Sequence, residues 1–118
     1  MTKAEARKAI RWFQKRAGIT DWKIALWLQD APPDWERERV VTASATHDPC
    51  YKRARIWISA SRASEDGESL LKCLFHECLH IAGRDAGFPF PTPETVEYLI
   101  DHVAEICEAA YLAETNGG

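Results

Sequence analysis

The chain has 118 residues, 15 Lys and Arg against 18 Asp and Glu for a net charge of -3, and an apolar share of 46%. These values predict one domain spanning residues 1–118 and argue against disorder, a fibrous rod or a second domain. No apolar run approaches the roughly 20 residues that cross a bilayer, and the charged N-terminus argues against a secretory signal. The four cysteines lack the spacing of a disulfide scaffold, so we expect a reduced, cytoplasmic setting.

Hydrophobic periodicity predicts a helix followed by three strands. Apolar residues recur at helical spacing from Lys3 to Ala17, and Gly18 follows as a candidate C-terminal cap. Alternating apolar residues predict strands at 22–28, 40–46 and 53–59, with a breaker at 30–34 and a turn at 47–50. The third strand is expected to point Ile56 and Ile58 toward the core and Trp57 toward the outer face.

Two further helices complete the predicted order. The first covers residues 68–83, with Ser64 or Asp66 as its N-terminal cap and Gly83 or Gly87 at its end. Thr92 and Pro93 open the last helix, and residues 114–118 are expected to fray. The predicted core face of the last helix is Val96, Leu99, Ile100, Val103, Ile106, Cys107, Ala110 and Tyr111. This order predicts an α+β fold around a small sheet.

The segment from His76 to His80 reads His-Glu-Cys-Leu-His and lies within the predicted helix at 68–83. Four residues make just over one helical turn, so the two imidazoles project from the same face and can reach one Zn²⁺ ion. Glu77 lies beside the metal without binding it, where it can take a proton from a zinc-activated water. The competing interpretation treats both histidines as partly buried structural residues.

A catalytic zinc site needs a third protein ligand, which we expect from the last helix because no third histidine follows the motif at close spacing. The candidates there are Glu94, Glu97, Asp101 and His102. Glu97 is favoured, with Glu94 as the fallback. Asp101 lies one turn after Glu97 on the same face and is expected to accept the other ring N–H of a ligating histidine.

These segments resemble the minimal zincin-like metallopeptidases of the gluzincin type, and in particular small metallopeptidase-like proteins encoded by phages and prophages. The resemblance rests on the segments 21–24, 51–58, 76–80 and 97–101. It implies a zincin-like fold of an N-terminal helix, a three-stranded sheet, the motif helix and a C-terminal ligand helix. It also implies peptide-bond hydrolysis, with His76, His80 and Glu97 as zinc ligands and Glu77 as general base.

The sequence therefore predicts a zinc-dependent hydrolase, specifically a metallopeptidase that acts on a peptide or protein substrate. The candidates for stabilising the oxyanion are Arg84, Tyr98, His102, His47 and Tyr51. The third strand is a candidate sheet edge for pairing with an extended peptide. No phosphate-binding loop or esterase motif is present, and the cysteines are interpreted as small buried apolar residues.

The alternative hypothesis is a zincin scaffold that serves as a binding module for a protein or nucleic acid. It is motivated by Lys3, Arg7, Arg11 and Lys15, which form one basic stripe on the first predicted helix. A solvated helix face is the simpler interpretation of that stripe, so nucleic acid is the less favoured partner, and no membrane is expected. Among the tryptophans, Trp35 is expected to be exposed in its loop.

Overall fold

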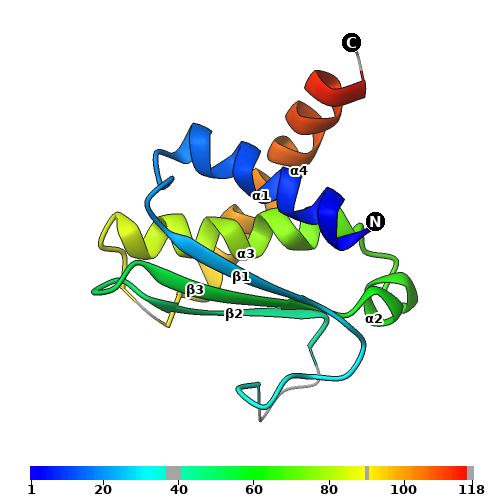
Figure 1. Cartoon of the computed structure of the whole chain (residues 1–118), viewed down its shortest axis with the longest axis horizontal. Helices are drawn as coiled ribbons and strands as arrows, with labels where there is room; N and C mark the ends of the chain where they lie inside the picture. The colour runs from blue at the N-terminus through cyan, green and yellow to red at the C-terminus, as the bar shows by residue number, and fades with distance from the viewer. Residues whose placement is uncertain (37–40, 90, 117–118) are drawn as a thin grey trace.

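A computed structural model describes residues 1–36, 41–89 and 91–116, which form four helices and a small mixed sheet in an α+β arrangement (Figure 1). Its elements are α1 (Lys3–Ala17), β1 (Lys23–Leu28), β2 (Ala43–Asp48), β3 (Arg53–Ile58), α2 (Ala60–Glu65), α3 (Leu70–Asp85) and α4 (Glu94–Asn116). The predicted fold class and the order of its main elements are confirmed, with the short helix α2 added. Within the described residues, no helix combines the length and apolarity needed to cross a membrane.

Helix α1 has the bounds that its sequence predicts. The Thr2 hydroxyl accepts the Glu5 N–H, and the Glu5 carboxylate accepts the Thr2 N–H, which together form a capping box. Gly18 ends the helix at φ 71°, a left-handed conformation that glycine adopts without steric cost. The capped helix buries Ala9 and Phe13 against the rest of the core.

The motif helix α3 begins later than predicted. Ser64 and Asp66 do not cap it, because both belong to the separate helix α2 and its C-terminal end. Gly67 follows at φ 68° and separates the two helices. Ser69 then caps α3 by accepting the Lys72 N–H, so the predicted cap was wrong by three residues or more.

Two other boundaries also differ from the prediction. Strand β2 continues to Asp48, because the turn that joins it to β3 lies at 49–52 and not at 47–50. The predicted start of this strand at Val40 lies outside the described residues. Helix α3 continues through Gly83 to Asp85, and of the two predicted terminal glycines only Gly87, at φ 87°, follows the end of the helix.

The sheet has the order β1-β3-β2, so the expectation that the third strand forms an edge is wrong. Strands β2 and β3 form an antiparallel hairpin, with Ala45 opposite Ile56. The free side of β3 is taken by β1, which runs parallel to it with Leu26 opposite Ile56. Because β3 is paired on both sides, the edges of the sheet are β1 and β2.

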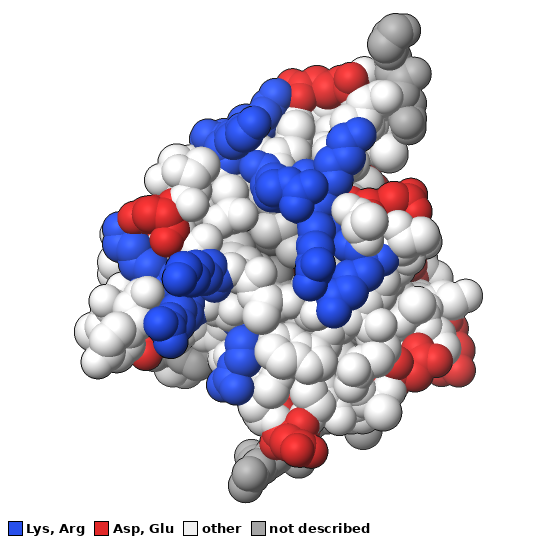
Figure 2. Space-filling view, viewed as in Figure 1, with Lys and Arg blue, Asp and Glu red and all other residues white. Residues whose placement is uncertain are grey.

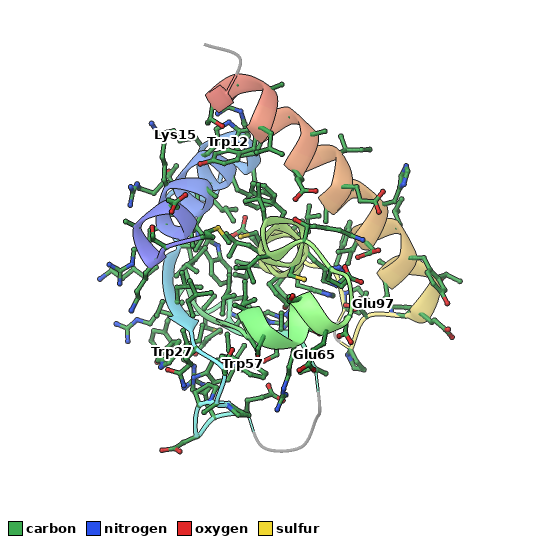
Figure 3. All side chains as sticks on the ribbon, turned by 90° about the vertical axis from the view of Figure 1, so that its right-hand side faces the viewer. Trp12, Lys15, Trp27, Trp57, Glu65 and Glu97 are labelled. Carbon is green, nitrogen blue, oxygen red and sulfur yellow. The ribbon has the colours of Figure 1, made fainter. Side chains whose placement is uncertain are left out.

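Trp57 lies on the outer face of the sheet, as predicted, but it is fully buried. Its indole N–H donates to the Gln29 carbonyl at 2.8 Å, and the Arg62 guanidinium lies over its ring. Trp35, which was expected to be exposed, is half-buried with its ring edge-on to Trp27. The loop after β1 therefore covers one end of the outer sheet face, near Trp27 and Trp57, both labelled in Figure 3.

Helix α3 lies between the inner sheet face and the helices α1 and α4 (Figure 1). Trp12, Phe75 and Tyr111 join the three helices, with ring centroids 5.2–5.7 Å apart, and Figure 3 shows Trp12 where α1 meets α4. The predicted core face of α4 is only partly buried, since Leu99 and Ile106 are exposed. The helix also continues through residues 114–116, which were expected to fray.

Candidate metal centre

The packing of α3 fixes the direction of its motif residues. Leu74, Phe75, Cys78 and Ile81 are fully buried and anchor one face of the helix in the core. His76 and His80 therefore lie on the flank of α3 that faces α4, one turn apart and both half-buried. The Nε2 atoms of the two imidazoles face each other and are 3.3 Å apart.

Helix α4 brings Glu97 to the two histidines, and Figure 3 shows this residue on the side of α4 that faces α3. One carboxylate oxygen of Glu97 lies 3.1 Å from Nε2 of His76, and the other lies 3.0 Å from Nε2 of His80. Within the described residues, His76, His80 and Glu97 form the only group of three potential ligands with donor atoms within 4.8 Å of one another. This group can hold a metal ion.

The donor spacing fits a small tetrahedral ion. Two ligand atoms that each lie about 2.05 Å from such an ion are about 3.3 Å apart. The two Nε2 atoms, 3.3 Å apart, match this value, and each of them lies 3.0–3.1 Å from one of the two oxygens of Glu97. The same spacing also allows each imidazole Nε2–H to donate to a separate oxygen of Glu97, so hydrogen bonds are the alternative to a metal ion.

Partners on the far side of each ring orient the histidines. Nδ1 of His76 lies 3.3 Å from the Asp101 carboxylate, and Nδ1 of His80 lies 3.4 Å from the Thr92 hydroxyl. A ring whose Nδ1–H donates to such a partner leaves the lone pair of Nε2 free for a metal. The structure thus brings Asp101 to the position that the sequence predicted for it.

Lys72 holds Asp101 in place. Its ammonium group lies 3.0 Å from Asp101, 3.2 Å from Glu105 and 3.6 Å from Glu68, and its side chain is only 15% exposed. Burial works against the charge on Asp101, but the hydrogen bonds from Lys72 and His76 outweigh it and hold the pKa of that carboxyl below its usual range. The hydrogen bonds from Lys72 to Asp101 and Glu105 outweigh burial and raise the pKa of Lys72, so Lys72 and Asp101 are both charged at neutral pH.

Glu77 is buried without a partner. The residue is only 8% exposed, and its side chain makes no hydrogen bond or ion pair with any residue that the structure describes. Burial, with the nearby carboxylates of Glu97 and Glu36, raises the pKa of Glu77 to about 8. A cation held by the neighbouring histidines would favour its ionised form.

The site opens into a cleft of about 630 Å³ between β2, α3 and the start of α4. The lining residues are Glu36, Val41, Ala43, Ser44, Ala45, His47, His76, Glu77, His80, Pro91, Thr92, Glu94 and Glu97. Glu94 therefore shares the cleft, but its carboxylate is not part of the ligand group and lies nearest the Tyr98 hydroxyl. The geometry selects Glu97 over Glu94 as the third potential ligand.

Of the five residues considered for stabilising an oxyanion, His47 alone lines this cleft. Burial, together with Arg84 and His80, lowers the pKa of His47, so it is a neutral imidazole at pH 7. Arg84 donates to the Phe88 carbonyl at the far end of α3. The other three candidates, Tyr51, Tyr98 and His102, are exposed outside the cleft.

Sequence reasoning missed the contributions of Glu36, Ser44, Thr92 and Lys72. Glu36 accepts the Ser44 hydroxyl at 2.6 Å across the cleft from α4. These residues come from a loop, a strand, a second loop and a different part of α3, and no local spacing connects them. Only the position of Lys72, four residues before His76, could have suggested that the two share a helix face.

No match to this chain was found among protein-family models, curated proteins or solved structures. The resemblance to gluzincin-type metallopeptidases therefore stays a prediction from the sequence. The chemical interpretation of the site depends on its geometry.

The first prediction concerns the third ligand. Glu97→Ala should weaken zinc binding by more than about 100-fold. This exceeds the loss that is typical when a residue that only hydrogen-bonds to a metal ligand is removed. Glu94→Ala removes the same charge from the same cleft but no ligand, so it should change the affinity by less than about threefold. Competition with a chromophoric chelator measures both affinities. The reverse order of effects would identify Glu94 as the ligand.

The second prediction concerns the orientation of His76. Asp101→Ala should weaken zinc binding by roughly 10–100-fold, because the ring loses the carboxylate that fixes its tautomer. Glu105→Ala is the matched control, since Glu105 also contacts Lys72 but makes no contact with His76. Isothermal titration with zinc distinguishes the two. Equal losses would mean that the net charge near Lys72 matters and the contact with the ring does not.

The third prediction concerns the cost of burying Glu77. Its folded-state pKa of about 8 lies above the ordinary value of 4.5, so its contribution to stability is present below pH 4.5 and is lost as the pH rises toward 8. In the metal-free protein, Glu77→Gln should therefore raise the melting temperature at pH 8 by at least about 4 °C. At pH 4 the parent and the variant should melt together. An equal gain at both pH values would point to packing and not to charge.

Proposed function

We propose that this protein is a zinc-dependent hydrolase, and specifically a metallopeptidase. The observation that carries the proposal is the combination of three converging ligand atoms with a buried, unpartnered carboxylate in one cleft. His76, His80 and Glu97 supply the ligands, and Glu77 supplies the carboxylate. A purely structural cluster would leave no reason to bury Glu77 without a partner, because burying an unpaired carboxylate destabilises the fold.

Zinc is the metal that this donor set favours. Two imidazoles and one carboxylate in a tetrahedral arrangement, with the fourth position facing a cleft, are the typical protein ligands of a catalytic zinc ion. Zinc bound there would polarise a carbonyl oxygen and lower the pKa of a water molecule in the open position. The cleft supplies the access that such chemistry requires.

Glu77 is positioned to move the proton. It follows His76 directly in α3 and lines the same cleft, so its carboxylate lies beside the fourth position and outside the ligand group. We infer that it accepts a proton from the attacking water and passes it to the leaving amine. His47, which is neutral and lies on the opposite wall, is the favoured donor to the oxygen that becomes negatively charged.

The edge strand β2 supports a peptide as the substrate. Ala43, Ser44 and Ala45 line the cleft, and among the strands that the structure describes β2 pairs with β3 alone, along one of its sides. An extended peptide could add to the free side as a further antiparallel or parallel strand, held by main-chain hydrogen bonds. The peptide bond would then lie between β2 and the ligands of α3.

The fourth prediction separates a general base from a ligand. Glu77→Gln keeps the size of the side chain but cannot accept a proton at neutral pH. This variant should bind zinc nearly as tightly as the parent, and its rate of peptide cleavage should fall by roughly 10²–10⁴-fold. A quenched fluorescent peptide library measures cleavage, and elemental analysis measures the bound zinc.

The control is His76→Ala, which should lose zinc and cleavage together. Loss of zinc from Glu77→Gln would show that Glu77 is a ligand. Equal activity of the parent and Glu77→Gln would show that another group activates the water. Absence of cleavage by the zinc-loaded parent would favour a scaffold that binds a partner without hydrolysing it.

A further inference from the structure

One face of the protein carries Lys and Arg side chains that the proposed site does not use (Figure 2). Helix α1 exposes Lys3, Arg7, Arg11 and Lys15, and Figure 3 shows Lys15 pointing away from the protein. Residues four apart in a helix are separated by about 6 Å along its axis. The row therefore presents positive charge at regular intervals along the whole length of α1.

These four cations have no partners within the described part of the chain, because none of them makes an ion pair or a hydrogen bond there. Two nearby cations differ in this respect: Arg16 pairs with Glu114, and Lys52 pairs with Asp21. Unpaired cations in a row leave a positive potential that can attract an anion. The paired cations provide a built-in comparison.

The basic surface continues onto the outer face of the sheet. Lys23 lies opposite Arg53 in the β1–β3 register, and Ala25 lies opposite Arg55. These residues, with Trp27, line a hollow of about 450 Å³ that the small side chain of Ala25 leaves open. The hollow thus combines three cationic side chains with an aromatic ring.

One carboxylate also lines the hollow. Asp48 lies opposite Arg53 in the register of β2 and β3, and its carboxylate accepts the Cys50 backbone N–H. The cations outnumber it three to one within the hollow. Arg55 is held in place by its donation to the Thr46 hydroxyl and by its position over the Trp35 ring.

We propose that this face binds single-stranded nucleic acid. The row on α1 contacts the phosphates, and the hollow on the sheet accepts a base beside Trp27. Proteins that bind single-stranded nucleic acids without sequence preference combine a positively charged track with adjacent aromatic side chains. The hollow can accept an unpaired base, whereas the bases of a duplex are already stacked on one another and cannot stack on Trp27.

The remaining surface argues against a membrane as the partner. A helix that lies on a bilayer needs an exposed apolar face beside its cations. Within the described residues of α1 no large apolar side chain is exposed. The charge is also segregated along the chain, with seven basic and two acidic residues at 1–23 but seven acidic and no basic residues at 85–118. A polyanion would therefore meet the α1 side and be repelled from α4.

The fifth prediction tests this surface by the fluorescence anisotropy of a labelled dT20 oligonucleotide. The parent should bind with a dissociation constant of roughly 1–100 µM at physiological salt. Arg7→Gln/Arg11→Gln should weaken binding, and the slope of log affinity against log salt should fall by about 1.4, which corresponds to two lost phosphate contacts. Arg16→Gln/Lys52→Gln removes the same charge from paired residues and should leave the slope unchanged.

A second pair of variants tests the hollow. Ala25→Glu places a negative charge in the hollow and should weaken oligonucleotide binding at least about tenfold. Ala109→Glu makes the same change at an exposed position of α4 and should have little effect. Thermal melting confirms that each variant is folded.

Three results would overturn the proposal. The first is no binding of dT20 at low salt. The second is an equal loss of oligonucleotide affinity in Arg7→Gln/Arg11→Gln and in its control, Arg16→Gln/Lys52→Gln. The third is tighter binding to a duplex of matched length, to phosphatidylserine vesicles or to polyglutamate than to dT20. None of these measurements depends on zinc or on peptide cleavage.

Discussion

The burial of one face of α3 is the constraint on which the rest of the structure depends. Leu74, Phe75, Cys78 and Ile81 pack against the sheet, α1 and α4, and they leave the helix no freedom to rotate. The imidazoles of the motif then have one possible direction, toward α4. Close packing of this kind holds ligand atoms more firmly than a loop could, because side chains in a dense core have few alternative rotamers.

The same packing places polar groups where they are costly. Glu77 is buried without a partner, and Lys72 lies among three carboxylates at only 15% exposure. The two cases differ in their effect on stability. Lys72 is compensated by Asp101 and its neighbours, so it joins α3 to α4. Glu77 has no such compensation, and a destabilising group at a fixed position is typical of residues retained for function.

The two proposed surfaces differ in the charge of the residues that the structure describes. The cleft is lined by Glu36, Glu94 and Glu97, and none of the Lys or Arg residues that the structure describes lines it. The outer face of α1 and the sheet carries the unpaired cations (Figure 2). His47 of β2 lines both the cleft and the hollow on the outer face of the sheet, so the two surfaces meet at this strand.

The sequence by itself determined the local features of this protein. Helical periodicity and the spacing of His76 and His80 depend on residues close in the chain, so the α+β class, α1 and the motif helix could be predicted. The sequence also favoured Glu97, but only as one of four candidates. Tertiary structure decided what depends on distant segments: the central position of β3, the convergence of Glu97 with both histidines, and the partner of Lys72. Packing between elements sets these contacts, and they cannot be predicted from the spacing of residues that are close in the sequence.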